Sequence, residues 1–265
     1  SGKGWYATWL AKQFYIRHQK KTVFFSLEMS EPLIRLRLLQ QWSGLTEEQM
    51  EEGAITAQAR NLLKQGGLLI YPFGQNNAEY QTPENFSADI DKFYEQGYRV
   101  FMFDHFHELD GANSDIGLNQ RVTQIWGKVF QEVCKKHIDI WLIVFAQPNG
   151  AAANKSFLTR TDISGSKGLT QKCEVFVSLN RQVIDKDFKI EDQQVQDRSV
   201  VFWVDKNRLS SSQKVGKMVF LSRTGNYTEY PDEDVLPDAA VLPKELTPRE
   251  MAEQLEITEK EKEKN

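Results

Sequence analysis

Three short apolar runs in the first 150 residues each end in a polar side chain, and this pattern constrains the fold most. The runs span residues 22–27, 99–103 and 138–146, and they are followed by Glu28, Asp104 and Gln147. Apolar runs of this length, bounded by turn and helix signals, are typical of buried strands. Ligands of a doubly wound sheet bind outside the carboxyl ends of its strands. We therefore expect these three polar side chains at a binding edge.

Helical patterns separate these runs, and the order of elements changes after residue 149. Helices are expected over residues 5–18, 32–42, 83–96 and 119–136, with another short strand over residues 68–71. Residues 149–168 are rich in small and polar side chains, which predicts a loop. Three more strands, over residues 175–179, 199–205 and 216–221, follow without helices between them. The expected fold class is α/β, with a mostly parallel central sheet flanked by helices and antiparallel strands at its C-terminal edge.

Charge is distributed unevenly along the chain. The net charge is −4 in total and −6 over residues 231–265, which leaves +2 on the first 230 residues. A nearly neutral body fits a protein that grips nucleic acid through local loops, and equally one that never touches nucleic acid. We predict one domain over residues 1–230 and an acidic, proline-containing linker with a short helical tail over residues 231–265. Residues 247–258 resemble the opening of a helix-turn-helix, although an exposed charged helix is the favoured interpretation.

The two cysteines, Cys134 and Cys173, exclude a disulfide scaffold and favour a reducing compartment. No apolar run approaches the ~20 residues of a membrane span, and the chain does not open with a secretory signal. The sequence therefore predicts a cytoplasmic protein, of a bacterial cell or a phage-infected host, without a membrane partner.

The chain opens with Ser1, Gly2, Lys3 and Gly4, directly before an amphipathic helix. A P-loop places such a turn against nucleotide phosphates at a helix N-terminus. Its lysine pairs with the β- and γ-phosphates, and a following Ser or Thr holds Mg²⁺. Lys3 fits the first role, whereas Gly4 offers no hydroxyl for the second. Taken alone, the four residues also fit a flexible chain end.

The polar residues at the strand ends allow both a functional and an ordinary interpretation. Asp104 suits a Walker B aspartate that orders Mg²⁺, presumably ordinary strand-end capping being the alternative. Glu28 is placed to polarise a water for attack on a γ-phosphate, or else it is a surface residue near a helix start. Gln147 is placed to sense the γ-phosphate, or else it is a solvated loop residue.

The order of these features resembles a RecA-like P-loop NTPase, and the local wording resembles the DnaB family of replicative helicases. Residues 23–30, Val-Phe-Phe-Ser-Leu-Glu-Met-Ser, carry the most specific similarity. Residues 103–109, 146–149, 162–171 and 205–208 are similar to further family motifs in the expected order. The resemblance covers residues 1–230 and implies an ATP hydrolase that translocates on single-stranded DNA.

The resemblance also implies roles for individual residues. Glu28 is the family's proposed catalytic base, and Lys206 and Arg208 reach the γ-phosphate of a neighbouring subunit. A channel loop contacts the DNA backbone, here through Ser164, Gly165, Ser166, Lys167 and Gly168. ATP and Mg²⁺ are the implied cofactors. The implied partners are single-stranded DNA, further copies in a hexameric ring, and a primase or helicase loader.

Several departures from the family pattern keep other functions open. Gly4 replaces the magnesium-binding hydroxyl, the first half of the P-loop is missing, and the family's N-terminal domain is absent, so we expect a fragment. The channel loop lacks the family's Arg-Glu pair, with Lys167 as a substitute charge. His105 and His107 flank the site, where we expect supporting or DNA-coupling roles rather than metal ligation.

Two alternatives to a helicase motor remain. One is a RecA- or RepA-like, or degenerate, ATPase that binds nucleotide and regulates a replication or recombination assembly without unwinding. The other is a nucleic-acid-binding module without hydrolysis. Hydrolysis stimulated by single-stranded DNA distinguishes the motor from both.

Overall fold

The computed structural model describes most of the first 229 residues. The described residues are 3–51, 60, 61, 64, 66–72, 82–105, 126–149, 152, 155, 157–163, 167–182, 189–190, 193–194, 199–210, 215–221 and 224–229. The expected linker and helical tail, residues 231–265, lie outside them. Among the described helices, none has the length and apolar character needed to cross a bilayer.

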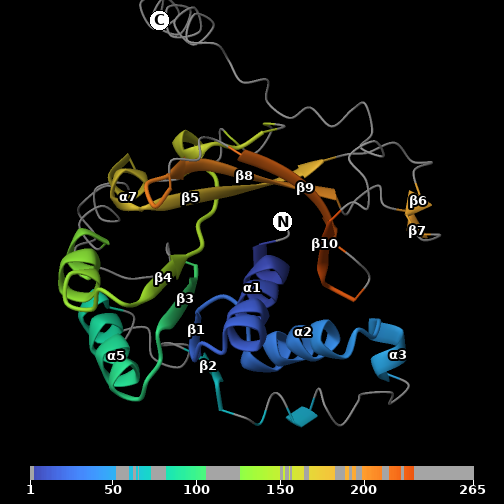
Figure 1. Cartoon of the computed structure of the whole chain (residues 1–265), viewed down its shortest axis with the longest axis horizontal. Helices are drawn as coiled ribbons and strands as arrows, with labels where there is room; N and C mark the ends of the chain where they lie inside the picture. Colours follow the sequence, from blue (N-terminus) through green and yellow to red (C-terminus); the bar gives the residue numbers. More distant parts are fainter. Residues whose placement is uncertain are drawn as a thin grey trace, which may run out of the picture.

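A four-stranded parallel sheet forms the centre of the fold (Figure 1). Its strands are β1 (Thr22–Ser26), β2 (Leu68–Tyr71), β3 (Val100–Asp104) and β4 (Trp141–Val144), in the order β2-β1-β3-β4. All three pairings are parallel. Every residue of β1 and β3 is buried, as expected for central strands that are covered on both faces. The four predicted strands are confirmed, although β4 begins three residues later than expected.

Helices cover both faces of this sheet, and the alternation of side chains along β1 shows how. Phe24 packs with residues of α1 (Lys3–His18) and α2 (Glu31–Ser43). Val23 and Phe25 point to the opposite face, where they pack with α5 (Pro83–Glu95) and the helical segment 126–134. Successive strand residues face opposite sides, so two cores form around one sheet. Figure 1 shows the two helix layers on either side of the strands.

The helix boundaries follow local signals in the sequence. Thr82 caps α5, since its Oγ1 accepts a hydrogen bond from the Asn85 N–H at 3.2 Å, and Pro83 occupies the first turn. α2 ends at Gly44, whose φ of 70° is readily adopted by glycine. α1 starts two residues before the predicted helix. A short helix, α3 (Glu47–Glu51), follows α2 where a capped start was predicted.

The predicted helix 119–136 is described only in its second half. Residues 126–134 are helical, and their last turn is a π-helical segment, η3 (Phe130–Cys134). Burial raises the pKa of the Cys134 thiol to about 11, so this cysteine stays protonated and unreactive at neutral pH.

The antiparallel strands form a sheet of their own. It contains β5 (Val175–Gln182), β8 (Ser199–Asn207), β9 (Val215–Leu221) and β10 (Tyr227–Glu229), in the order β10-β9-β8-β5. A separate two-stranded ribbon joins β6 (Lys189–Ile190) and β7 (Gln193–Gln194). The sequence predicted antiparallel strands at the edge of the parallel sheet. The strands are present, but β5 pairs with β8, and the described residues of β4 pair with β3 alone.

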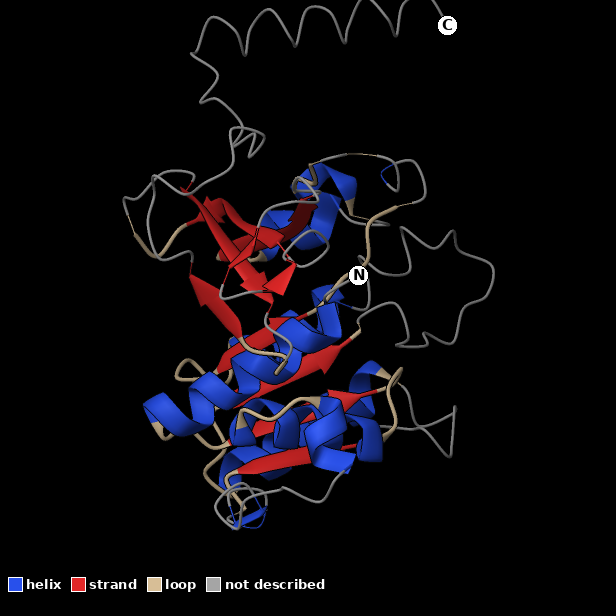
Figure 2. Cartoon of the chain, turned by 90° about the vertical axis from the view of Figure 1, so that its right-hand side faces the viewer, coloured by secondary structure: helices blue, strands red, loops and turns tan. Residues whose placement is uncertain are grey.

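α1 joins the two sheets. Tyr6 contacts Phe202 of β8 and Tyr227 of β10, with ring centroids 5.0 and 5.7 Å apart. Lys12 Nζ donates to the Asn226 side chain at 2.8 Å and to the Gln41 carbonyl at 2.6 Å. Figure 2 shows the antiparallel strands stacked above the helix-covered parallel sheet. The helix that begins at Lys3 therefore packs against both halves of the fold.

Candidate functional site

Lys3, Glu28 and Asp104 meet at the carboxyl end of the parallel sheet. Lys3 is the first residue of α1, and its Nζ lies 3.0 Å from Asp104 Oδ1 and 3.4 Å from Glu28 Oε2. The contact with the buried Asp104 is an ion pair rather than a well-aligned hydrogen bond. The first turn of α1 holds no acidic residue, so its N-terminus offers an uncompensated positive dipole. This combination suits an anionic ligand.

Pairing between β1 and β3 sets the separation of the two carboxylates. Ser26 lies opposite Asp104 in the register, and the Leu27 N–H continues the pairing by donating to the Asp104 carbonyl at 3.0 Å. Glu28 therefore leaves the strand one residue later, beside Asp104. The Glu28 side chain is half exposed, whereas that of Asp104 is 2% exposed. One carboxylate is open to water and the other is fixed inside the fold.

The sequence analysis missed two neighbours of this pair. His105 Nε2 lies 3.6 Å from Glu28 Oε2, and the imidazole is buried. Arg37 of α2 approaches Gly4, because a Cβ added to Gly4 would lie 2.4 Å from Arg37 Nη1. The helical spacing carried a signal for this arginine: Ile34, Leu38 and Gln41 are buried, and Arg37 lies three residues from Ile34 on the same face.

Gln147 follows β4 and is exposed, close to a backbone connection with a later segment. Pro148 forms an isolated antiparallel bridge with Ile163, and the Asn149 N–H donates to the Asp162 carbonyl at 2.8 Å. Ile163 directly precedes the predicted DNA loop, which begins at Ser164. The end of β4 and the start of that loop are therefore tied together by backbone.

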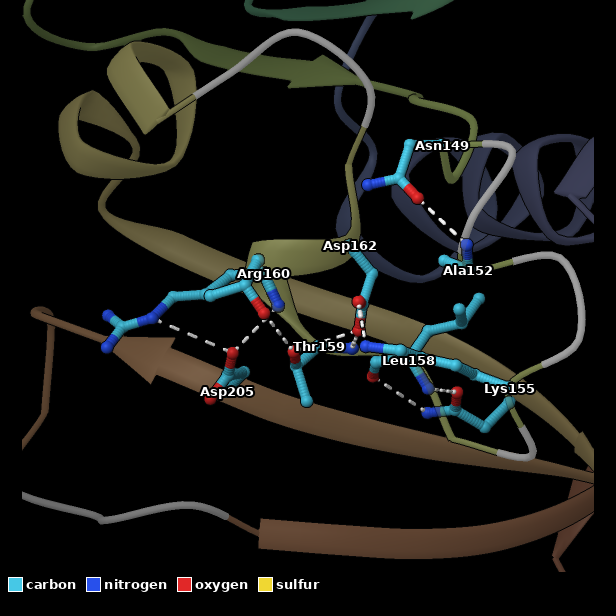
Figure 3. A network of polar contacts seen from close by, with 10 residues as sticks. Asn149, Ala152, Lys155, Leu158, Thr159, Arg160, Asp162 and Asp205 are labelled. Carbon is cyan, nitrogen blue, oxygen red and sulfur yellow. Dashed lines mark hydrogen bonds and ion pairs between the residues drawn. The ribbon is translucent and has the colours of Figure 1, made fainter. Parts of the chain in front are cut away.

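Asp162 fixes the bend before this loop (Figure 3). Its Oδ2 accepts hydrogen bonds from the Thr159 N–H at 2.8 Å and the Thr159 hydroxyl at 3.0 Å, and its Oδ1 pairs with Lys155 Nζ at 2.5 Å. These contacts close the short helix η5 (Arg160–Asp162). Burial raises the pKa of the Asp162 carboxyl, but the hydrogen bonds from Lys155 and Thr159 outweigh it, and the net pKa is below the usual value.

We expect Asp162→Ala to lower the free energy of unfolding by about 2 kcal/mol, because it removes a charged acceptor from a buried backbone donor. Urea denaturation measures the change. Asp139→Ala is the control, since Asp139 pairs with Arg99 at the surface with its side chain 53% exposed, and it is expected to cost well under half as much. Equal losses in the two variants would contradict the role given to Asp162.

Lys206 and Arg208 lie at the far end of β8 and both have partners within the chain. Lys206 Nζ donates to the carbonyls of Thr170 and Gln171, both at 2.8 Å, near the C-terminal end of α7 (Lys167–Lys172). Arg208 is exposed, and its Nη1 lies 3.7 Å from Glu174 Oε1. The structure therefore places neither side chain beside Lys3, Glu28 or Asp104 of the same chain.

Several predicted site residues lie outside the described part of the chain. Ser1, Gly2 and His107 are among them, as are Ser164, Gly165 and Ser166. Lys167 and Gly168 are described through their backbone alone, as the first two residues of α7.

The carboxylates at the sheet edge suit Mg²⁺ in one respect. Mg²⁺ is usually held by one or two carboxylates together with substrate phosphates. Asp104 and Glu28 offer such oxygen donors, and within the described residues no cluster of three or more His, Cys, Asp or Glu side chains forms a metal cage. Gly4 provides no hydroxyl ligand, so the residues fit a metal held by Asp104, water and phosphate.

Comparisons with known proteins agree on the family and on the fold. The family described as the DnaB-like helicase C-terminal domain matches residues 1–229. A solved DnaB-like replicative helicase, studied with its primase interactions, superposes with a TM-score of 0.71 at 16% identity, covering 86% of this chain. The chain spans 55% of that protein's length. A solved ATPase domain gives a TM-score of 0.68 at 15% identity, covering 86% of this chain and 81% of its own. No curated protein matches the sequence. The RecA-like α/β fold predicted from the sequence is confirmed.

Proposed function

Because the chain belongs to the family of DnaB-like helicase C-terminal domains, we propose that it is the ATP-driven motor domain of a replicative DNA helicase. In this proposal residues 1–230 form the ATPase domain, and residues 231–265 form a linker and helical tail. ATP hydrolysis at subunit interfaces drives translocation along single-stranded DNA.

The observation that best supports this proposal is the position of Lys3. Its ammonium group begins a helix at the carboxyl end of a parallel sheet and lies between two carboxylates from neighbouring strand ends. Phosphate groups are attracted to this helix terminus and compete with the carboxylates for the same ammonium. Ser1, Gly2 and Gly4 belong to the same turn and complete the phosphate-binding loop.

Each carboxylate has a distinct role in this mechanism. The buried Asp104 holds Mg²⁺ through water, and the metal, when bound, neutralises charge on the phosphates. The half-exposed Glu28 reaches solvent and acts as the base that polarises the attacking water. His105 orients Glu28, since the imidazole is buried and lies 3.6 Å from the carboxylate.

The connection beyond Gln147 supports coupling between nucleotide and DNA. Gln147 senses the γ-phosphate, and the bridge between Pro148 and Ile163 carries its position to the loop that starts at Ser164. Residues 164–168 bind the DNA backbone through N–H groups and the Lys167 charge, without reading sequence. Lys206 ties β8 to α7, which begins within the same loop.

Assembly into a ring, most plausibly of six subunits, completes the active site in this proposal. Arg208 is exposed and held by one surface carboxylate, so it is available to reach the γ-phosphate of a neighbouring subunit. Lys206 must leave the α7 carbonyls to join it. A primase is a proposed partner, because a structural relative has been solved in the context of its primase interactions. A helicase loader is the second proposed partner.

A non-motor ATPase of the same family is the second candidate function. Gly4 favours it, because the residue leaves the Mg²⁺ site without its hydroxyl ligand. Such a protein binds nucleotide and regulates a replication or recombination assembly without unwinding DNA.

ATP hydrolysis by the full-length protein, measured with and without single-stranded DNA, tests the proposal. We expect turnover that rises on addition of DNA. Nucleotide binding without turnover in either condition would select the regulatory ATPase and reject the motor. DNA binding that is indifferent to nucleotide would reject both.

A further inference from the structure

Arg37 of α2 occupies the space beside Gly4 where a side chain of a P-loop residue would lie. A Cβ built on Gly4 would approach Arg37 Nη1 to 2.4 Å and Met29 Sδ to 3.0 Å, which is closer than real contacts allow. Any larger residue at position 4 therefore has to displace the guanidinium group. Gly4 is thus more than a lost hydroxyl, because its missing side chain makes room for a cation.

The guanidinium is held in this position by two contacts. Arg37 Nη1 donates to Met29 Sδ at 3.1 Å, and Arg37 Cζ lies 5.0 Å from the centre of the Trp5 ring. Trp5 is fixed in turn, since its ring packs directly on Gly225 and its carbonyl accepts a hydrogen bond from Gln41 Nε2 at 3.1 Å. The arginine therefore rests on a rigid aromatic surface at the first turn of α1.

Most of the hydrogen-bonding capacity of this arginine is unused. A guanidinium has five N–H donors, and among the described residues the Arg37 side chain donates to a thioether sulfur, which is a weak acceptor. Burial lowers the pKa of Arg37, whereas the charges of Asp104 and Glu28 raise it, so the group stays protonated and feels both carboxylates. A half-buried cation with free donors, facing this site, matches the geometry of a phosphate ligand.

We propose that Arg37 binds the nucleotide phosphates from within the same subunit, in the space that Gly4 leaves open, and compensates for the missing hydroxyl. This inference rests on the proposed nucleotide site, and it assigns Arg37 a different position from the trans-acting Arg208. It also predicts that restoring a hydroxyl at position 4 weakens nucleotide binding, since the new side chain displaces the arginine.

Equilibrium binding of ATP and ADP to the full-length protein, with Mg²⁺ and with EDTA, tests the proposal. We expect Arg37→Met to weaken both nucleotides by at least about tenfold under both conditions, because a charge-assisted contact is lost while the apolar stem remains. Arg35→Met is the matched control, since Arg35 pairs with Glu31 four residues earlier on α2, and it should bind nucleotide normally. Wild-type affinity in the Arg37→Met variant would overturn the proposal.

A double-mutant cycle between positions 4 and 37 separates this role from simple packing. Gly4→Ser is expected to lose about as much affinity as Arg37→Ala, and the double variant should lose little more than either one. Losses that multiply in the double variant would overturn the proposal. The Gly4→Ser arm keeps the native arginine, so the test stays decisive even if changes at Arg37 impair folding. Failure of the unaltered protein to bind nucleotide would reject the proposed function itself.

Discussion

Glu28→Gln is expected to lower ATP turnover by about 10²–10⁴-fold while leaving nucleotide binding nearly unchanged. The amide keeps the size of the carboxylate but cannot accept the proton of the attacking water. Glu28 suits this role because its side chain is half exposed beside the buried Asp104. Steady-state hydrolysis with single-stranded DNA present, together with ATP affinity, measures the two effects separately.

Glu31→Gln is the matched control for this change. Glu31 lies three residues further on, in the first turn of α2, where it forms a surface pair with Arg35. The same loss of one negative charge there should leave turnover within about twofold, as surface pairs contribute little. If Glu28→Gln also kept near-normal turnover, Glu28 would not be the base, and the attacking water would have to be activated elsewhere.

Arg208→Ala is expected to reduce turnover by about 10³–10⁵-fold in the assembled protein, the usual contribution of an arginine finger. The side chain is 53% exposed, and its contact with Glu174 at 3.7 Å is a weak surface pair that is easily given up. Arg160→Ala is the control. Arg160 is similarly exposed, and its closer contact with Asp205 is made by its backbone N–H, which the substitution retains.

Mixing two inactive variants tests whether Arg208 acts across a subunit boundary. A Glu28→Gln subunit carries an intact Arg208, and an Arg208→Ala subunit carries an intact Glu28. In mixed rings, some interfaces therefore combine both functional residues, and partial turnover should return. Mixtures that stay as inactive as the separate variants, despite assembling together, would show that Arg208 does not serve a neighbouring site.

The strands that carry the site could be predicted because they are short, apolar and bounded by clear signals. Glu28 and Asp104 were placed at one edge from this pattern alone, and the register of β1 against β3 brings them together. β10 was missed, since a three-residue strand with polar members has no distinct pattern. The separate antiparallel sheet was also missed, because sequence alternation shows that strands exist but not which strands pair.

Contacts between distant segments account for the rest of what the sequence did not reveal. The approach of Arg37 to Gly4 joins residues on two helices, and their relation depends on how α1 and α2 pack on the sheet. Lys206 was expected to face a neighbouring subunit, but within the chain it binds the carbonyls of Thr170 and Gln171. Its role across a boundary stays a prediction.

The packing of α1 against both sheets has a mechanical consequence. Lys3 begins this helix, and Tyr6 and Trp9, one to two turns along, press against Tyr227 of the antiparallel sheet. A helix transmits displacement along its axis with little loss, so a sub-ångström pull on its first turn reaches the second sheet almost undiminished. The phosphate-binding turn and the strand that ends in Arg208 are then two ends of one lever, whose fulcrum is an aromatic contact.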